Sequence, residues 1–287
     1  MNFENIKPDP SKSSILENMV NLELVQSIER EHLHNAISGE KAPPLNIYKD
    51  SRTGEIFCEI LNSRHPRVQK LTSLIIKGAI NGADIIENEG RYYSHVQESE
   101  NIKDNSPDIR KELVADINLL YLLLNSTDHD LDNRHGVIKS HSGWKELHNV
   151  FIDDVGGKVY YFDFEKVSDI YRYHDQPEQY AYDGYHDSFE DLAAHEFKTT
   201  VYGNDNTKLE MIKQKITKIL DTSLSDIETF KKIIQKSGVQ LDNEDFKNFE
   251  FKGASKNERI IELFHEFKFR AEKVLEAVTK VIETKST

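Results

Sequence analysis

Apolar residues recur at helical spacing in several parts of the chain. Between residues 14 and 38 they stand three and four positions apart, and Gly39 follows this stretch as a helix stop. The pattern predicts a helix over residues 14–38 that carries Glu23. The same spacing predicts a helix from His65 to about Ile76 and another over residues 108–125.

The last expected helix, from about Lys256 to Glu283, has the most regular apolar stripe. Its members alternate at spacings of four and three: Ile260, Phe264, Phe267, Ala271, Val274, Val278 and Val281. Such a stripe indicates a helix face that packs on a core. Two Ser-x-x-Glu pairs, Ser225 with Glu228 and Ser255 with Glu258, are typical of capping boxes at helix N-termini.

Short β-prone runs separate the expected helices. LNIYKD (residues 45–50) and EIFCEIL (residues 55–61) flank a polar turn, and this pattern predicts a β-hairpin. NVFIDD and KVYYFDF flank a Gly-Gly turn and predict a second hairpin over residues 149–164. The run RYYSHV (residues 91–96) is typical of a strand, and the rest of residues 80–108 is expected to be irregular surface.

Composition narrows the class of protein. The chain has 37 basic and 50 acidic residues, and a net charge of −13 disfavours nucleic acid as a partner. The single cysteine, Cys58, allows no intramolecular disulfide and favours a reducing, cytoplasmic setting. The sequence has no apolar run near the roughly 18 residues of a membrane span, and the N-terminus lacks the apolar core of a cleaved signal. We therefore expect no membrane span.

The segment NSTDHDLDNRHGV (residues 125–137) concentrates charge directly after an apolar helix. One interpretation is a solvated turn, because Asp and Asn are common where a helix ends. A second is a metal-dependent phosphohydrolase, since His-Asp pairs occur at 129–130, 174–175 and 186–187. Such sites seat the pair within a helix, whereas no helical stripe surrounds residues 129–130. The third interpretation is a kinase catalytic loop.

The kinase interpretation depends on spacing and order. Asp128 precedes Asn133 by five residues, and the hairpin that follows ends in Asp163-Phe164. An Asp that orients the attacking hydroxyl, with an Asn and a second Asp that hold metal ions, suits phosphoryl transfer. Upstream, Lys7 lies sixteen residues before Glu23, in a β-prone run, which fits a lysine that contacts nucleotide phosphates and a glutamate that holds it.

With these motifs the chain resembles the protein kinase superfamily, in particular its divergent bacterial branches. TDHDLDNRHG is similar to the catalytic loop of HipA-like kinases, and IKPDPSKSS with the following helix is similar to the lysine strand and first helix of bacterial effector kinases. The resemblance spans about residues 5–170. It implies that Lys7 contacts the ATP phosphates, Glu23 pairs with Lys7 and Asp128 is the catalytic base. It also implies that Asn133 and Asp163 bind Mg²⁺ or Mn²⁺.

The fold expected from this resemblance is α+β, a kinase-like bilobal fold with a mostly helical C-lobe and a helical C-terminal extension. The N-lobe is expected to be shortened and to lack the glycine-rich loop, because six residues precede Lys7. The expected divisions are residues 1–64 for the N-lobe, 65–206 for the C-lobe and 207–287 for the extension. Glu165 stands where the family has the glycine of Asp-Phe-Gly, and no Ala-Pro-Glu signature follows.

The function implied is ATP-dependent transfer of the γ-phosphate to a Ser/Thr hydroxyl of a protein substrate. Two alternatives stay open: transfer of another group from ATP, such as AMP, and a pseudokinase that binds nucleotide or acts as a scaffold without turnover. The likeness to effector kinases also implies a bacterial protein delivered into a host cytosol, where a host activator would organise the site.

Overall fold

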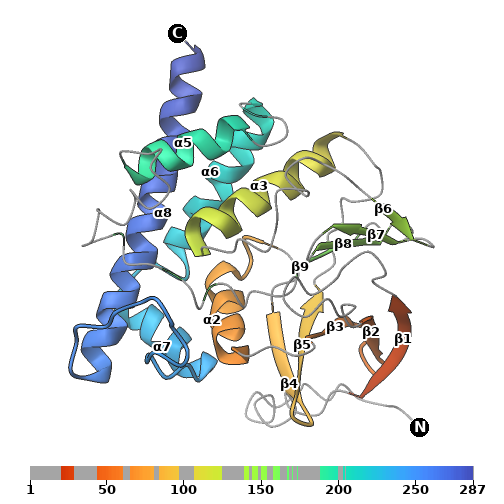
Figure 1. The fold of residues 1–287 in the computed structure, drawn as a ribbon. Coiled ribbons are helices and arrows are strands. Elements are labelled where there is room, and N and C mark those ends of the chain that lie inside the picture. The colour runs from red at the N-terminus through yellow and green to blue at the C-terminus, as the bar shows by residue number, and fades with distance from the viewer. Residues whose placement is uncertain are drawn as a thin grey trace, which may run out of the picture.

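The computed structural model describes residues 21–28, 44–60, 65–80, 84–96, 107–124, 139–141, 144–147, 150–153, 158–161, 188–199 and 205–286, with the single residues Val167, Ile170, Tyr173 and Gly203. Within these residues the fold is α+β and mostly helical, with two antiparallel sheets and six helices. The helices gather on one side of the molecule and the sheets on the other (Figure 1).

The larger sheet has five antiparallel strands in the order β1-β2-β3-β5-β4. Its strands are β1 (Leu22–Ile28), β2 (Leu45–Asp50), β3 (Ile56–Ile60), β4 (Asp84–Asn88) and β5 (Arg91–Val96). The smaller sheet has the order β6-β7-β8-β9. Its strands are β6 (Lys139–His141), β7 (Trp144–Leu147), β8 (Val150–Asp153) and β9 (Lys158–Tyr161). The two sheets approach each other where β9 contacts β5.

The helices are α2 (Pro66–Ile76), α3 (Pro107–Leu124), α5 (Phe189–Thr199), α6 (Asn206–Asp221), α7 (Ile227–Ser237) and α8 (Lys256–Ser286). The long helix α8 runs along the helical side and contacts α3, α5, α6 and α7 (Figure 1). Helix α2 lies between the five-stranded sheet and the C-terminal helices, since it contacts both β4 and α7. One hydrophobic core joins α2 and α3 to the C-terminal helices.

Several elements agree with the pattern of the sequence. Both predicted hairpins are confirmed, as β2–β3 and β8–β9, and RYYSHV forms β5. The predicted helices at residues 65–76 and 108–125 are confirmed as α2 and α3. The seven stripe residues of α8 are all buried. The four-three spacing in α8 therefore marked a core-facing surface.

The helix predicted over residues 14–38 is wrong for residues 22–28, which form strand β1. Leu22, Val25 and Ile28 have helical spacing, but the backbone pairs with β2 instead. The pairing register shifts between Leu24 and Gln26, as at a β-bulge. An extra residue in one strand breaks the period of two that would have indicated a strand in the sequence.

The segment predicted to be irregular before RYYSHV contains strand β4. A two-residue turn joins β4 to β5, since Asn88 pairs with Arg91. Glu89 and Gly90 both have positive φ, 51° and 75°, as a two-residue type I′ turn requires. Glycine takes this conformation without strain, but a glutamate before it does not resemble the usual Asn-Gly signal of such turns.

The five-stranded sheet continues across the boundary predicted at residues 64 and 65. Strands β4 and β5 come after α2 in the chain, yet β5 pairs with β3 along its whole length. Helix α2 is therefore an insertion between two neighbouring parts of one sheet. Its apolar face, which includes Val68, Leu71 and Ile75, packs into the common core with Ile85 of β4.

The two predicted capping boxes have different outcomes. At the start of α8 the Ser255 hydroxyl accepts a hydrogen bond from Glu258 N at 3.2 Å, and Ser255 N donates to the Glu258 carboxylate at 2.8 Å. This reciprocal pair is the predicted box. At α7 the cap is Asp226, not Ser225, because the Asp226 carboxylate accepts from Thr229 N at 2.9 Å. The adjacent Asp outcompetes Ser225 as an acceptor.

Lys208, in the first turn of α6, has a fully buried side chain. Its Nζ donates to Phe197 O, near the end of α5, at 3.0 Å. Burial lowers the pKa of the Lys208 ammonium to about 8, and Lys285 lowers it further, while Asp205 and Glu196 raise it. The helices α5 and α6 thus meet around an ammonium group that is easily deprotonated.

We expect this lysine to make folding stability increase in mildly alkaline solution. The folded-state pKa of about 8 is below the ordinary value of 10.5. Between these values the unfolded chain holds the proton and the folded chain has released it, so the free energy of unfolding rises with pH. Urea titrations at pH values from 7 to 10 should show this rise in the wild type and a smaller one in Lys208→Met. Parallel curves for the two proteins would contradict the assignment.

Candidate functional site

The segment with the predicted catalytic loop is framed by described elements. Helix α3 ends at Leu124, and Asp128 is the fourth residue beyond it. Strand β6 begins at Lys139, after Asn133. Strand β9 ends at Tyr161, two residues before Asp163. Asp128, Asn133, Asp163 and Lys7 themselves lie outside the described residues, so their predicted roles stay predictions.

The C-terminal end of α3 is held firmly by α8. Leu122 and Leu124 are buried, and the Arg270 guanidinium of α8 donates from Nη1 to Leu122 O at 3.2 Å. Arg270 Nε also donates to Glu266 Oε1 at 2.7 Å, and both side chains are 1% exposed. Arg270 further lies over the Tyr173 ring, 4.5 Å from its centroid. The point from which the Asp-rich segment departs is therefore fixed in the core.

A second network ties α3 to α6. Lys215 of α6 donates to Asp116 and to Glu112, both on α3. Although burial lowers the pKa of Lys215, the two carboxylates raise it above its ordinary value. Lys215 is thus a partly buried cation with two anionic partners, which offset the cost of removing its charge from water. These bonds hold one face of α3 while α8 holds its end.

Strand β9 leads from the smaller sheet back to the core. It contacts β5, and the chain after Asp163 returns to the core at Val167 and Ile170, which are fully buried. In the sequence, the predicted metal-binding Asp163 comes between Tyr161, the last residue of β9, and the buried Val167. Figure 1 shows β9 beside the end of β5, with α3 beyond it.

Glu23 is the one predicted site residue that the structure describes. It lies on β1, not on a helix, and its strand neighbour on β2 is Lys49. The Glu23 side chain is exposed. The predicted helix that carries Glu23 is therefore wrong: residue 23 is on β1, the edge strand of the five-stranded sheet. Its pairing with Lys7 stays untested.

The third strand and the helix after it carry an unexpected set of charges. In protein kinases a lysine of the third strand pairs with a glutamate of the following helix. Here β3 (IFCEI) has Glu59 as its one charged residue, and α2 (PRVQKLTSLII) has Arg67 and Lys70 but no acid. The charges on these two elements are therefore the reverse of the kinase arrangement.

Glu59 is the centre of a hydrogen-bond network on the sheet. Its carboxylate is 4% exposed and accepts from Asn46 Nδ2 at 2.9 Å, from Tyr48 Oη at 3.0 Å and from Arg91 Nη1 at 3.1 Å. The Tyr48 ring meets Tyr93 edge to face at 5.4 Å. Three strands, β2, β3 and β5, thus share one buried anion, and Arg91 supplies the matching charge.

This network shifts the titration of its neighbours. Burial raises the pKa of Tyr48 to about 12, and the hydrogen bond and charge of Glu59 raise it as well. The charge of Glu59 also raises the pKa of Arg91. Both groups therefore stay protonated at neutral pH and donate to Glu59. The hydrogen bonds from Tyr48 and Arg91 to Glu59 therefore hold the strands together at neutral pH, and neither donor releases its proton near pH 7.

A cavity of about 400 Å³ adjoins the sheet, between β3, β4, β5, α2 and α7. Several of its charged residues are paired with each other: Lys77 with Asp84 at 2.7 Å, Arg52 with Asp50 at 3.4 Å and His95 Nε2 with Glu55 at 3.5 Å. Because both signs of charge line the cavity, it shows no clear preference for nucleotide phosphates. In the part of the chain that the structure describes, no group of three His, Cys, Asp or Glu residues is arranged to hold a metal ion.

Known proteins give no independent indication of the function. No model of a protein family matches the chain, and a search of curated proteins gives no match. Among the described helices, none is both long enough and apolar enough to cross a membrane. The function must therefore be argued from the elements and residues themselves.

Proposed function

We propose that this chain is a divergent kinase-like phosphotransferase that transfers the γ-phosphate of ATP to a Ser/Thr hydroxyl of a protein, with Mg²⁺ or Mn²⁺ as cofactor. The proposal includes a kinase-like bilobal fold. It rests above all on the order of the described elements: three antiparallel strands, a helix and two further strands of the same sheet, then α3 before the Asp-rich segment and the strands β6–β9 after it.

The position of α2 supports the proposal. In protein kinases the phosphate-binding lysine is on the third strand and its glutamate partner is on the next helix, so a helix follows three strands. In this chain α2 follows β3, and the chain then returns to add β4 and β5 beside β3. The likeness is in the order of strands and helix only, because β3 carries no lysine and α2 carries no glutamate.

The stretch of chain from α3 to β9 supports it as well. A buried helix, an Asp-rich segment and a β-hairpin before Asp163 follow one another as the kinase catalytic and metal-binding segments do. We assign Asp128 as the base that orients the attacking hydroxyl. Asn133 and Asp163 would hold the cation through oxygen atoms, which Mg²⁺ and Mn²⁺ prefer. When bound, the cation offsets the charge of the nucleotide phosphates.

The proposal assigns the phosphate contact of the N-terminal region to Lys7, as the resemblance implies. The protein substrate, a cytosolic setting in a host cell and an activator there are part of the same proposal. They rest on the likeness to bacterial effector kinases alone.

One observation favours a second function, a pseudokinase that binds nucleotide or acts as a scaffold without turnover. The third strand carries buried Glu59 instead of a lysine, and α2 carries no glutamate. An anion fixed at that position would repel nucleotide phosphates if they approached it as in other kinases. The two functions predict different outcomes for the same assay.

The decisive experiment is a labelled-nucleotide assay with the full chain. The protein is incubated with Mg²⁺ or Mn²⁺ and with ATP labelled at the γ- or the α-phosphate, with and without eukaryotic cell extract. Incorporation of γ label into protein supports the kinase. Incorporation of α label indicates AMP transfer. Nucleotide binding without incorporation of either label supports the pseudokinase, and no binding at all overturns both.

Asp163→Ala is expected to abolish metal-dependent nucleotide binding. The reason is that the Asp163 carboxylate is proposed as a ligand of the cation that bridges the phosphates. Isothermal titration with ATP and Mn²⁺ measures the effect, and Asp221→Ala, an exposed aspartate at the end of α6, is the matched control. Equal ATP affinity in the two variants would remove Asp163 from the site.

A further inference from the structure

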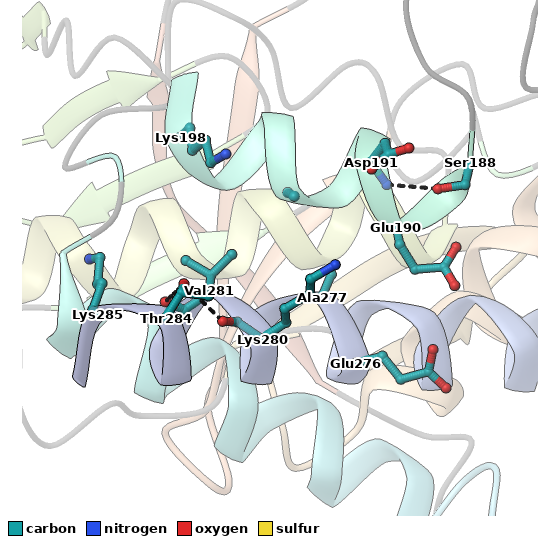
Figure 2. A pocket seen from close by; sticks show the side chains of 11 residues that line it. Ser188, Glu190, Asp191, Lys198, Glu276, Ala277, Lys280, Val281, Thr284 and Lys285 are labelled. Atoms are coloured by element: carbon teal, nitrogen blue, oxygen red, sulfur yellow. Dashed lines mark hydrogen bonds between the residues drawn. The ribbon is translucent and has the colours of Figure 1, made fainter. Parts of the chain in front are cut away.

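A groove of about 570 Å³ lies between α5 and the C-terminal half of α8 (Figure 2). Its lining residues are Ser188, Glu190, Asp191, Ala194, Lys198, Glu276, Ala277, Lys280, Val281, Thr284 and Lys285. The volume is in the range of small-molecule sites, roughly 300–1,000 Å³. The groove lies where α5, in the predicted C-lobe, meets α8 of the predicted C-terminal extension, and it does not depend on the proposed kinase activity.

Small side chains leave the groove open. Ala194 of α5 and Ala277 of α8 contribute to its lining where the two helices contact each other. Val281, also at the groove, is 9% exposed. Below it, Phe197 and Val278 are fully buried and fix the two helices in the core. The groove is therefore a stable feature of the helix pair.

The charges in the groove are separated along its length. Figure 2 shows Glu190, Asp191 and Glu276 at one end and Lys198 and Lys285 toward the other, while the Lys280 side chain extends from the middle toward Ala277. At the acidic end Lys273 neutralises both glutamates, since its Nζ lies 2.7 Å from Glu190 and 2.9 Å from Glu276. Asp191 also lines the groove at this end, so the end stays acidic although both glutamates are paired.

The basic end has no such compensation in the described part of the chain. No carboxylate there lies within ion-pair distance of the ammonium groups of Lys198, Lys280 or Lys285. Lys285 Nζ donates to the neutral side chain of Asn206 at 3.2 Å. Asp205 is close to Asn206, but its carboxylate is paired with Lys111 at 3.3 Å. Lys198, Lys280 and Lys285 therefore line the groove, and among the described residues no carboxylate pairs with them.

The charges of the lysines outweigh the partial negative charges of the helix ends near Lys198 and Lys285. Lys198 and Lys285 are in the last turns of α5 and α8, where each helix end contributes about −0.5 elementary charge. Two helix ends thus offset about one of the three ammonium charges. The buried Lys208 is also near Lys285, which lowers its pKa besides burial, but Asp205 and Glu196 act on Lys208 as well and offset its charge.

We propose that the basic end of this groove binds a phosphate monoester. A phosphate dianion matches several ammonium groups at once, and charge-assisted hydrogen bonds to it are stronger than neutral ones. The groove is larger than a phosphate group, so it also accommodates the organic part that carries the phosphate. The phosphate belongs either to a free small molecule or to a phosphorylated side chain.

Calorimetric titration of the full chain tests the site with O-phosphoserine and with a short peptide that contains phosphoserine. Serine, the unphosphorylated peptide and glutarate serve as probes without phosphate. The variant Lys198→Gln/Lys280→Gln should bind the phosphorylated probe about tenfold more weakly or worse. Lys232→Gln, an exposed lysine on α7 outside the groove, is the matched control and should bind as the wild type does.

The outcomes separate the two sources. Binding of O-phosphoserine and the phosphopeptide supports the site and a phosphorylated segment as its ligand. Binding of O-phosphoserine alone supports the site and a free small molecule. The proposal is overturned if neither phosphorylated probe binds at about 10 mM, if glutarate binds equally well, or if Lys198→Gln/Lys280→Gln binds like Lys232→Gln. Unchanged thermal melts of both variants show that lost binding is not lost folding.

Discussion

Replacing Arg270 with Met is expected to lower the free energy of unfolding by about 3–5 kcal/mol, which is typical when one partner of a buried ion pair is removed. Glu266 would lose the guanidinium that lies 2.7 Å from it, and Leu122 O would lose a donor. Met occupies a volume similar to the aliphatic part of Arg, so the loss reports mainly on charge and hydrogen bonding. Urea denaturation followed by circular dichroism measures it.

The double variant Glu266→Leu/Arg270→Met is the control. It removes both charges, so no unpaired carboxylate remains in the core, and replacing a buried pair with apolar residues is often neutral or stabilising. We expect the double variant to be more stable than Arg270→Met alone. If both variants are equally unstable, the packing of Arg270 against Tyr173 and α3 matters more than the charge of Glu266.

Asp128→Asn should lower turnover by at least about a thousandfold if the chain is the proposed kinase, while ATP affinity changes little. An amide cannot accept the proton of the attacking hydroxyl, and this interaction matters mainly in the transition state. Initial rates at saturating ATP measure turnover, and calorimetry measures affinity. An active Asp128→Asn beside an inactive Asp130→Asn would shift the catalytic position by two residues.

The fold was most predictable where local propensity and the apolar pattern indicate the same element. The stripe of α8 and the hairpin β2–β3 were visible in the sequence because packing and propensity agree there. Strand β1 was missed because Leu22, Val25 and Ile28 imitate a helix, and the bulge after Leu24 breaks the alternation of a strand. Pairing with β2 decides its structure, and a distant partner cannot be seen in a local window.

The hydrogen-bond network around Glu59 could not be predicted from the sequence either. A charged residue in the middle of the β-prone run EIFCEIL is a signal of a buried polar contact, but it does not identify the partner. Arg91 reaches Glu59 because β5 pairs with β3 after the chain has passed through α2. Spacing along the chain predicts neighbours in a hairpin, whereas it does not predict which strand returns after an inserted helix.

The burial of α3 has a consequence for how the chain folds as it is synthesised. Helix α3 is made early, yet it packs on α6 and α8, and the donor to Leu122 O is Arg270, 148 residues later. A ribosome-bound chain must therefore hold the apolar face of α3 exposed until almost the whole protein has emerged. Contacts so distant in sequence slow folding and leave time for aggregation. Nascent chains that stop before α8 should consequently depend on chaperones that shield apolar surface.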